Sequence, residues 1–168
     1  MGTQQRDFAE FYRETRNECL LAILVSVGDR DIAQDLAAEA FARAWASWPT
    51  VSRHPAPAAW VVRTALNAGV SRWRRRHRET PVPNPALVAD RPSAGPGSSV
   101  DPAIMAALLR LPLRQRQVVA LRLFLDLDTA RTAQVLGIAP GTVQAHLGRA
   151  LATLRGELSP IRQQEARS

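Results

Sequence analysis

Five prolines lie between Glu79 and Val100, and this segment limits most strongly what the chain can fold into. Glycine and serine are frequent in its second half, so the segment can supply neither helical periodicity nor a core. A long active-site loop is the alternative, but the segment holds no cluster of catalytic residue types. We therefore predict a linker over residues 79–100, extended in its proline-rich half and flexible in the other, which leaves the flanking units without a fixed orientation.

The segments on both sides of this linker have helical patterns. Apolar residues recur at three- and four-residue steps from Phe8 to Val27, further helices are expected from near Asp31 and near Ala58, and no segment alternates like a strand. After the linker, Asp101-Pro102 provides an N-cap and a first-turn proline. The helices expected from there cover 103–109, 113–124, 128–136 and 141–158.

The sequence thus predicts an all-α fold of two small helical domains joined by a Pro/Gly/Ser-rich linker. The predicted domains cover residues 1–78 and 101–158, and a polar tail covers residues 159–168.

Charge is distributed unevenly along the chain. The 168 residues include 22 arginines, no lysine and 15 acidic residues, for a net charge of +7. By segment, residues 1–39 carry −4, residues 40–78 carry +8, residues 79–101 carry −2 and residues 102–168 carry +5. A high-GC genome explains the missing lysine but not where the arginines are placed. Because arginine binds phosphate in bidentate fashion, two basic units indicate a polyanionic partner.

Several classes of protein are disfavoured by the sequence. It has no apolar run of the roughly 20 residues that a membrane span requires, and no N-terminal secretory pattern, so we expect a cytoplasmic protein. A lone Cys19 is expected to be buried, and His54, His77 and His146 have no partners at metal-ligand spacing. Without a clustered Asp/Glu, Cys/His or Ser/His set, we predict no catalytic residues, metal, cofactor or small-molecule substrate.

Residues 129–144 have the spacing of a helix-turn-helix. Ala133 is small where two helices would cross, Gly137 suits the left-handed end of the first helix, and Val143 would anchor the second. On the second helix an apolar stripe is formed by Val143, Leu147, Ala150, Leu151 and Leu154. An ordinary helical hairpin with a polar outer face is the alternative.

The polar face of this second helix suits a DNA major groove. Its small residues leave room for base edges, and its guanidinium supplies a positive charge for DNA. Thr142, near the helix N-terminus, can contact a phosphate. The preceding helix adds Arg110, Arg114, Arg116 and Arg122 without an acid, which favours DNA binding further. The DNA-contacting residues predicted in this unit are Arg114, Thr142, Gln144, Ala145, Gly148 and Arg149.

A second arginine cluster ends the N-terminal unit. Residues 72–78 hold five arginines, at the end of a helix that starts near Trp60 and includes Arg63 and Asn67. Cations favour a helix C-terminus, but five exceed that structural role, so phosphate neutralisation and a steep salt dependence are expected. The residues predicted to contact DNA here are Trp60, Arg63, Asn67, Arg72, Arg74, Arg75 and Arg76.

An acidic helix face precedes this cluster. Asp31, Asp35 and Glu39 lie at i, i+4 and i+8, and an apolar set is expected on the other side: Leu36, Ala40, Phe41 and Trp45. An acidic face does not serve DNA. From the residues alone, a solvated face and a docking surface for a basic protein are equally favoured.

The order of these features along the chain resembles that of a bacterial sigma factor. The resemblance is to the extracytoplasmic-function (ECF) class, which is group 4 of the sigma-70 family, and to its actinobacterial members. Residues 31–45 resemble region 2.2, residues 47–57 the region 2.3 loop, and residues 60–76 region 2.4. Residues 111–118 and 141–143 resemble parts of region 4. The chain departs from the family pattern at Ala38, where glutamine is usual, and at Ser71, Thr129 and Arg131, where acids are common.

The resemblance implies a sigma factor that binds core RNA polymerase through its β′ and β subunits and directs initiation at promoter DNA. Regions 2.3 and 2.4 would capture a flipped base and open the −10 element, and region 4 would read the −35 element. The polymerase contacts implied are Asp31, Asp35, Glu39 and Phe41. An anti-sigma factor is a partner of many members of the family.

Two other functions stay open at this point. One is a helix-turn-helix transcription regulator that is not a polymerase subunit and whose N-terminal unit senses a signal or dimerises. The other is an enzyme or RNA-processing factor that uses its arginines as a phosphate clamp.

Overall fold

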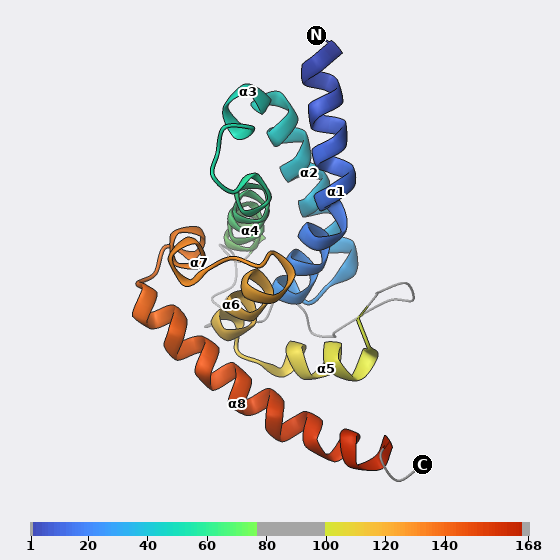
Figure 1. Cartoon of the computed structure of the whole chain (residues 1–168), viewed down its shortest axis with the longest axis vertical. Coiled ribbons are helices and arrows are strands. Elements are labelled where there is room, and N and C mark those ends of the chain that lie inside the picture. The colour runs from blue at the N-terminus through green and yellow to red at the C-terminus, as the bar shows by residue number, and fades with distance from the viewer. Residues whose placement is uncertain (1, 77–99, 166–168) are drawn as a thin grey trace.

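The computed structural model describes residues 2–76 and 100–165, which form eight helices and no strand (Figure 1). The first four helices are α1 (Gly2–Val27), α2 (Arg30–Ala46), α3 (Trp48–Val51) and α4 (Pro57–Arg76). The second four are α5 (Pro102–Arg110), α6 (Leu113–Phe124), α7 (Thr129–Leu136) and α8 (Pro140–Glu165). The all-α fold class is confirmed, whereas the linker predicted from residue 79 lies, except for Val100, outside the described residues.

Helix boundaries differ from the prediction at three places. Helix α1 starts six residues before Phe8, at Gly2, and the short helix α3 forms where a loop was expected. The predicted end of the last helix at Leu158 is wrong, because α8 continues through Pro160 to Glu165. Pro160 removes only one backbone donor, and the good helix formers Arg162, Gln163 and Gln164 follow it.

Side-chain caps set the starts of helices α2, α5 and α7. Asp29 Oδ1 accepts a hydrogen bond from Ile32 N at 2.9 Å and begins α2. Asp101 and Asp128 begin α5 and α7 in the same way, each accepting from a backbone N–H at 2.7 Å. Each cap satisfies a donor that the first helical turn would otherwise leave unpaired.

The two helical units share a hydrophobic core. One cluster of buried side chains includes Ile23 and Leu36 from the N-terminal unit together with Met105, Leu108 and Leu121 from the C-terminal unit. Helix α6 packs against α1, and α7 packs against α4. The expectation that the units have no fixed orientation therefore does not describe this structure.

The apolar end of α1 explains this packing. Residues 22–26 are all buried, although a helix that faces solvent would expose some positions in every turn. Helices α2, α4 and α6 all pack against α1, and Arg116 of α6 donates a hydrogen bond to Ser26 O of this segment. A helix that is apolar all round must be covered all round, so α1 draws both units into one body.

Cys19 is confirmed as buried, and burial changes its acidity. Desolvation is the main cause that raises the pKa of its thiol to about 12. The folded protein therefore holds this proton more tightly than the unfolded chain does, and stability falls as pH rises from about 9 towards 12. In chemical denaturation at alkaline pH, we expect Cys19→Ala to show a shallower decline over this range than wild type; equal slopes would contradict the expectation.

Candidate nucleic-acid interface

The helix-turn-helix forms as its spacing predicts. Gly137 ends α7 in the left-handed conformation, with φ of 64°, which glycine adopts without strain. A small cluster of buried residues, Val118, Ala133 and Val143, holds α6, α7 and α8 together. The predicted apolar stripe of α8 is buried or half-buried along its length. This packing fixes which face of α8 points outward.

That outward face carries the residues predicted to contact DNA. Thr142, Gln144, Ala145, Gly148 and Arg149 are all exposed. No atom of another part of the chain lies within 4 Å of where a Cβ on Gly148 would be, so the face is open there. The face is therefore shaped to enter a groove without a bulky side chain in the way.

Arg114 lies at the start of α6. Its side chain is exposed, and one guanidinium nitrogen donates a hydrogen bond to Gln117 Oε1 at 3.2 Å. This contact is with a neutral amide of the same helix, so the charge stays available to a phosphate.

Helix α4 carries the second set of predicted DNA contacts. Its buried side comprises Ala59, Val61, Val62, Ala65 and Leu66. Arg63 and Asn67 are exposed and Trp60 is half-buried, which places these three at i, i+3 and i+7 along one face. At its C-terminal end Arg74, Arg75 and Arg76 are exposed as well.

Arg72 differs from these arginines because it is already paired. Its guanidinium forms an ion pair with Glu39 of α2, and the same carboxylate accepts from Arg43 at 2.6 Å. Gly69 helps bring the helices together: a Cβ there would lie 3.2 Å from Leu36 Cδ1. Glu39, predicted as a polymerase contact, thus ties α2 to α4.

The other predicted polymerase contacts are split between surface and core. Asp31 and Asp35 are exposed on α2 and make no ion pair within the described part of the chain. Phe41, also predicted as a polymerase contact, is only 5% exposed and packs edge-on against Tyr12. Phe41 therefore shapes the surface from beneath.

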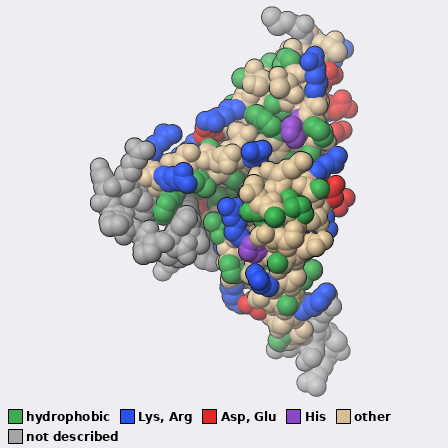
Figure 2. Space-filling model, turned by 90° about the vertical axis from the view of Figure 1, so that its left-hand side faces the viewer, with side chains coloured by type: hydrophobic (Ala, Val, Ile, Leu, Met, Phe, Trp, Pro, Cys, Tyr) green, Lys and Arg blue, Asp and Glu red, His purple; other side chains and the backbone are tan. Residues whose placement is uncertain are grey.

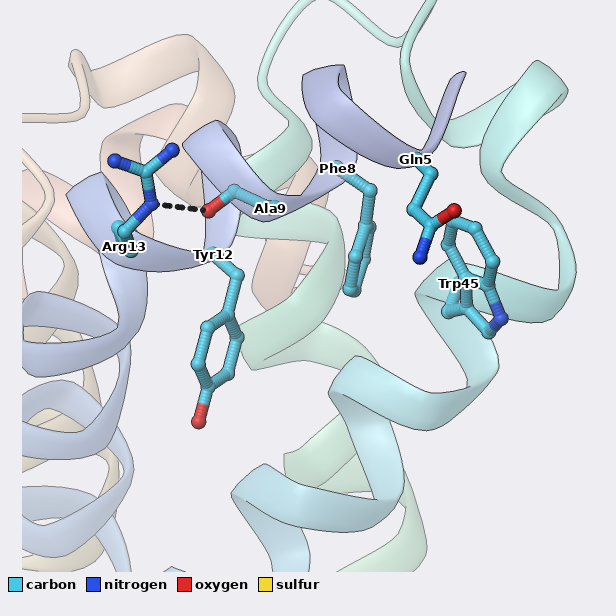
Figure 3. Close-up of a pocket in the computed structure, with 6 residues that line it drawn as sticks. All are labelled: Gln5, Phe8, Ala9, Tyr12, Arg13 and Trp45. Carbon is cyan, nitrogen blue, oxygen red and sulfur yellow. Dashed lines mark hydrogen bonds between the residues drawn. The ribbon is translucent and has the colours of Figure 1, made fainter. Parts of the chain in front are cut away.

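The structure also contains an aromatic groove that the sequence did not reveal. Phe8, Tyr12 and Trp45 line a hollow of about 510 Å³ between the N-terminal half of α1 and the end of α2 (Figure 3). Trp45 was expected on the apolar side of α2, but 45% of it is exposed, since Phe8 covers one part of its ring and leaves the rest open. Only the packing of α1 on α2 brings these rings together, although the i, i+4 spacing of Phe8 and Tyr12 was a signal.

A second hollow continues the groove. It is lined by Tyr12, Arg16, Leu20, Gln34 and Phe41, among other residues, so Tyr12 belongs to both hollows. The groove runs along α1 and α2, and the α2 residues that line its second hollow include Gln34 and Ala38, which flank Asp35 in the sequence. Apolar area with charged residues at its edge is typical of a protein docking surface.

Separate arginine side chains are exposed on the face of the molecule shown in Figure 2. They are scattered over this face, whereas acidic side chains gather mostly along one edge of it. Within residues 2–76 and 100–165, no helix is long and apolar enough to cross a bilayer. The same residues contain no group of three side chains suited to holding a metal ion.

A helix-turn-helix with an open outer face, joined to a helical unit that ends in arginines, defines a DNA-binding transcription protein. Two family models match the chain, sigma-70 region 2 over residues 13–79 and sigma-70 region 4 over residues 102–154. The RNA polymerase sigma-E factor of Streptomyces coelicolor is 34% identical over 153 residues, which span 90% of this chain and 86% of that protein. The sigma-E factor of Streptomyces antibioticus is 36% identical over 154 residues, spanning 90% and 84% of the two chains.

The ECF sigma factor SigM of Mycobacterium tuberculosis is 34% identical over 146 residues, spanning 86% of this chain and 72% of that protein. The chain belongs to the ECF class of the sigma-70 family, the factors that direct promoter-specific transcription initiation by RNA polymerase. A solved structure of similar fold is the sigma factor RpoE of Bartonella quintana in complex with the anti-sigma factor NepR. It is 23% identical, with a TM-score of 0.72, and the match covers 92% of this chain and 98% of that one.

Proposed function

We propose that this sigma factor contacts the −10 element through α4 and the −35 element through α8. The observation that carries the proposal is the pair of separate surfaces that present exposed arginine, one along α4 and one on the outer face of α8. Trp60 and Asn67 add an aromatic face and an amide to the first surface, as capture of an unpaired base requires. Each surface meets phosphates with arginine and bases with smaller or planar groups.

The polymerase-binding surface in this proposal is the groove of α1 and α2 with its acidic edge. Asp31 and Asp35 are exposed carboxylates without ion-pair partners in the described residues, and Tyr12 and Trp45 supply exposed aromatic area in the groove. A partner helix with an apolar stripe and flanking basic residues would fit this surface, because the stripe would pack on the aromatic side chains and the basic residues would pair with the carboxylates. Glu39 and Phe41 contribute indirectly in this proposal: Glu39 pairs with Arg72 of α4, and Phe41 packs beneath Tyr12 of the groove.

Opening of the promoter needs no catalytic residue in this scheme. The cost of unstacking a base is offset by its capture next to Trp60 and by backbone contacts from arginine. We accordingly propose a non-enzymatic factor without metal or cofactor that acts with RNA polymerase in the cytoplasm. Sigma factors, as a family, are generally not catalytic.

The linker and the domain boundaries belong to the same proposal. Residues 1–78 would be the polymerase and −10 domain, residues 79–100 the linker that spans between the two promoter elements, and residues 101–158 the −35 domain. We also propose an anti-sigma factor as a partner, since the RpoE of similar fold is bound by NepR.

Run-off transcription with purified core polymerase tests this function. We expect the protein to start transcription at a cognate promoter, and we expect Asp31→Arg/Asp35→Arg to reduce initiation and core binding about tenfold or more, through like-charge repulsion at the docking surface. The matched control is Asp7→Arg/Glu10→Arg, which adds the same charge on exposed positions of α1. Promoter binding without core polymerase, unaffected by the first variant, would indicate a helix-turn-helix regulator instead.

A further inference from the structure

A cavity of about 330 Å³ lies between α7 and the start of α4, two helices that pack against each other (Figure 1). The residues of α7 that line it are Arg131, Gln134 and Val135, and the proposed function uses none of them. Small-molecule sites in proteins have volumes of about 300–1,000 Å³, so this cavity is at the lower end of that range. A ligand of the size of one nucleotide would suit it.

Part of the lining is apolar and aromatic. Ala59 is buried, and Trp60 and Val135 are half-buried, so an indole and aliphatic side chains line the cavity here. A planar base stacks on an indole whatever its sequence identity, because every base has a flat π-face. This part of the lining is therefore suited to an aromatic ring.

Two arginines make the cavity positively charged. Arg63 comes from α4 and Arg131 from α7, both are exposed, and neither makes an ion pair within the described residues. No acidic side chain of the described residues lines the cavity. The two cations repel each other, whereas an anion in the cavity would be attracted by both. Arginine binds phosphate with two parallel N–H donors, which makes phosphate the anion that fits best.

Neutral polar groups complete the lining. His54 Nδ1 accepts a hydrogen bond from Ala56 N at 3.0 Å, so the ring proton of the neutral imidazole must be on Nε2. His54 therefore brings one more N–H donor to the cavity. Gln134 is exposed, and its amide offers both a donor and an acceptor, the pair that matches the edge of a base such as adenine.

We propose that this cavity binds a free nucleoside monophosphate, with its base against Trp60 and its phosphate held by Arg63 and Arg131. The ligand is a small molecule, and part of its site comes from α7, to which the proposed function gives no contact with the −10 element. The site therefore goes beyond the proposed function. Its residues come from two helices and the segment before α4, so no single sequence motif marks it.

Calorimetric titration of the full chain with AMP and with GMP tests the proposal. We expect saturable binding of one equivalent with a Kd below about 1 mM for at least one of the two nucleotides. Inorganic phosphate and the corresponding nucleoside each make only part of the contacts, so each should bind about tenfold or more weakly. No saturable binding of either nucleotide, or binding of phosphate as tight as that of the nucleotide, would overturn the proposal.

Two variants test whether the ligand lies between the helices. Arg63→Gln and Arg131→Gln each remove one cation, from α4 and from α7, and each should lower nucleotide affinity about tenfold or more. Both side chains are exposed, so the variants should fold, which thermal unfolding checks. Arg155→Gln, exposed on α8 and outside the lining, removes the same charge and should change affinity by no more than about twofold, because salt screens a distant charge. A loss in only one of the two cavity variants, or an equal loss in Arg155→Gln, would contradict the proposed site.

A short single strand of mixed sequence separates this site from a DNA-binding surface. Arg131 lines the cavity but is not among the proposed DNA contacts. Arg131→Gln should therefore weaken nucleotide binding without weakening single-strand binding more than Arg155→Gln does. A parallel loss for the nucleotide and the single strand would mean that the cavity serves DNA, and the proposal would fail. These measurements contain neither core polymerase nor a promoter, so a failure of run-off transcription would overturn the proposed function alone.

Discussion

Arg75→Gln/Arg76→Gln should lower the affinity for promoter DNA about thirtyfold at about 0.15 M salt. Each phosphate contact adds about 0.9 to the slope of log affinity against log salt, so the loss of two contacts costs about fivefold each under these conditions and flattens the slope by about 2. Both side chains are exposed at the end of α4, and no ion pair within the described residues holds either of them. Their removal should therefore leave the fold unchanged.

The measurement is a salt titration of binding by the complex of the protein with core polymerase. Arg6→Gln/Arg155→Gln removes the same charge from exposed positions of α1 and α8 that we do not assign to DNA. A slope that flattens equally in both double variants would mean that α4 attracts DNA only through net charge. Arg72 is left out of the test because it pairs with Glu39.

Val143→Asp should abolish initiation at a promoter that requires the −35 element. Val143 is fully buried, and its cluster contains only two other buried side chains, Val118 and Ala133. A buried carboxylate there has no partner, so we expect the free energy of unfolding to fall by about 3 kcal/mol or more. A cluster of three buried side chains is too small to stay folded after such a loss. Helix α8 would then lose the support that fixes its outer face.

Hydrogen exchange and transcription together check this expectation. Amides of α7 and the start of α8 should lose protection, while those of α2 and α4 should keep most of theirs. Ala152→Asp introduces the same charge at an exposed position of α8 and should preserve both protection and activity. Retained −35-dependent initiation in Val143→Asp would show that α8 does not need this anchor.

Much of the candidate site could be predicted because its signals are local. Gly137, Ala133 and Val143 define the helix-turn-helix through backbone geometry and spacing within a few turns of helix. The arginines at the end of α4 and the outer face of α8 follow from helical periodicity alone. Aspartate caps mark helix starts in the same local way.

Other features could not be predicted because they depend on which helices meet. Trp45 was expected on the apolar side of α2, and only its packing against Phe8 of α1 shows that it lines an open groove. The ion pair of Glu39 with Arg72 joins residues 33 positions apart, and it changes the part that each can take in binding. No periodicity within one helix carries such information.

The sequence by itself determined an all-α fold, a helix-turn-helix and two basic surfaces, since each depends on residues that are neighbours along one helix or turn. The tertiary structure decided how those surfaces face one another. The proline-rich segment indicated two units free to move, yet the apolar end of α1 is buried all round, and α6 supplies part of that cover. Burial of apolar area from distant segments is a property of the folded chain, so only the structure shows that α7 lies over α4.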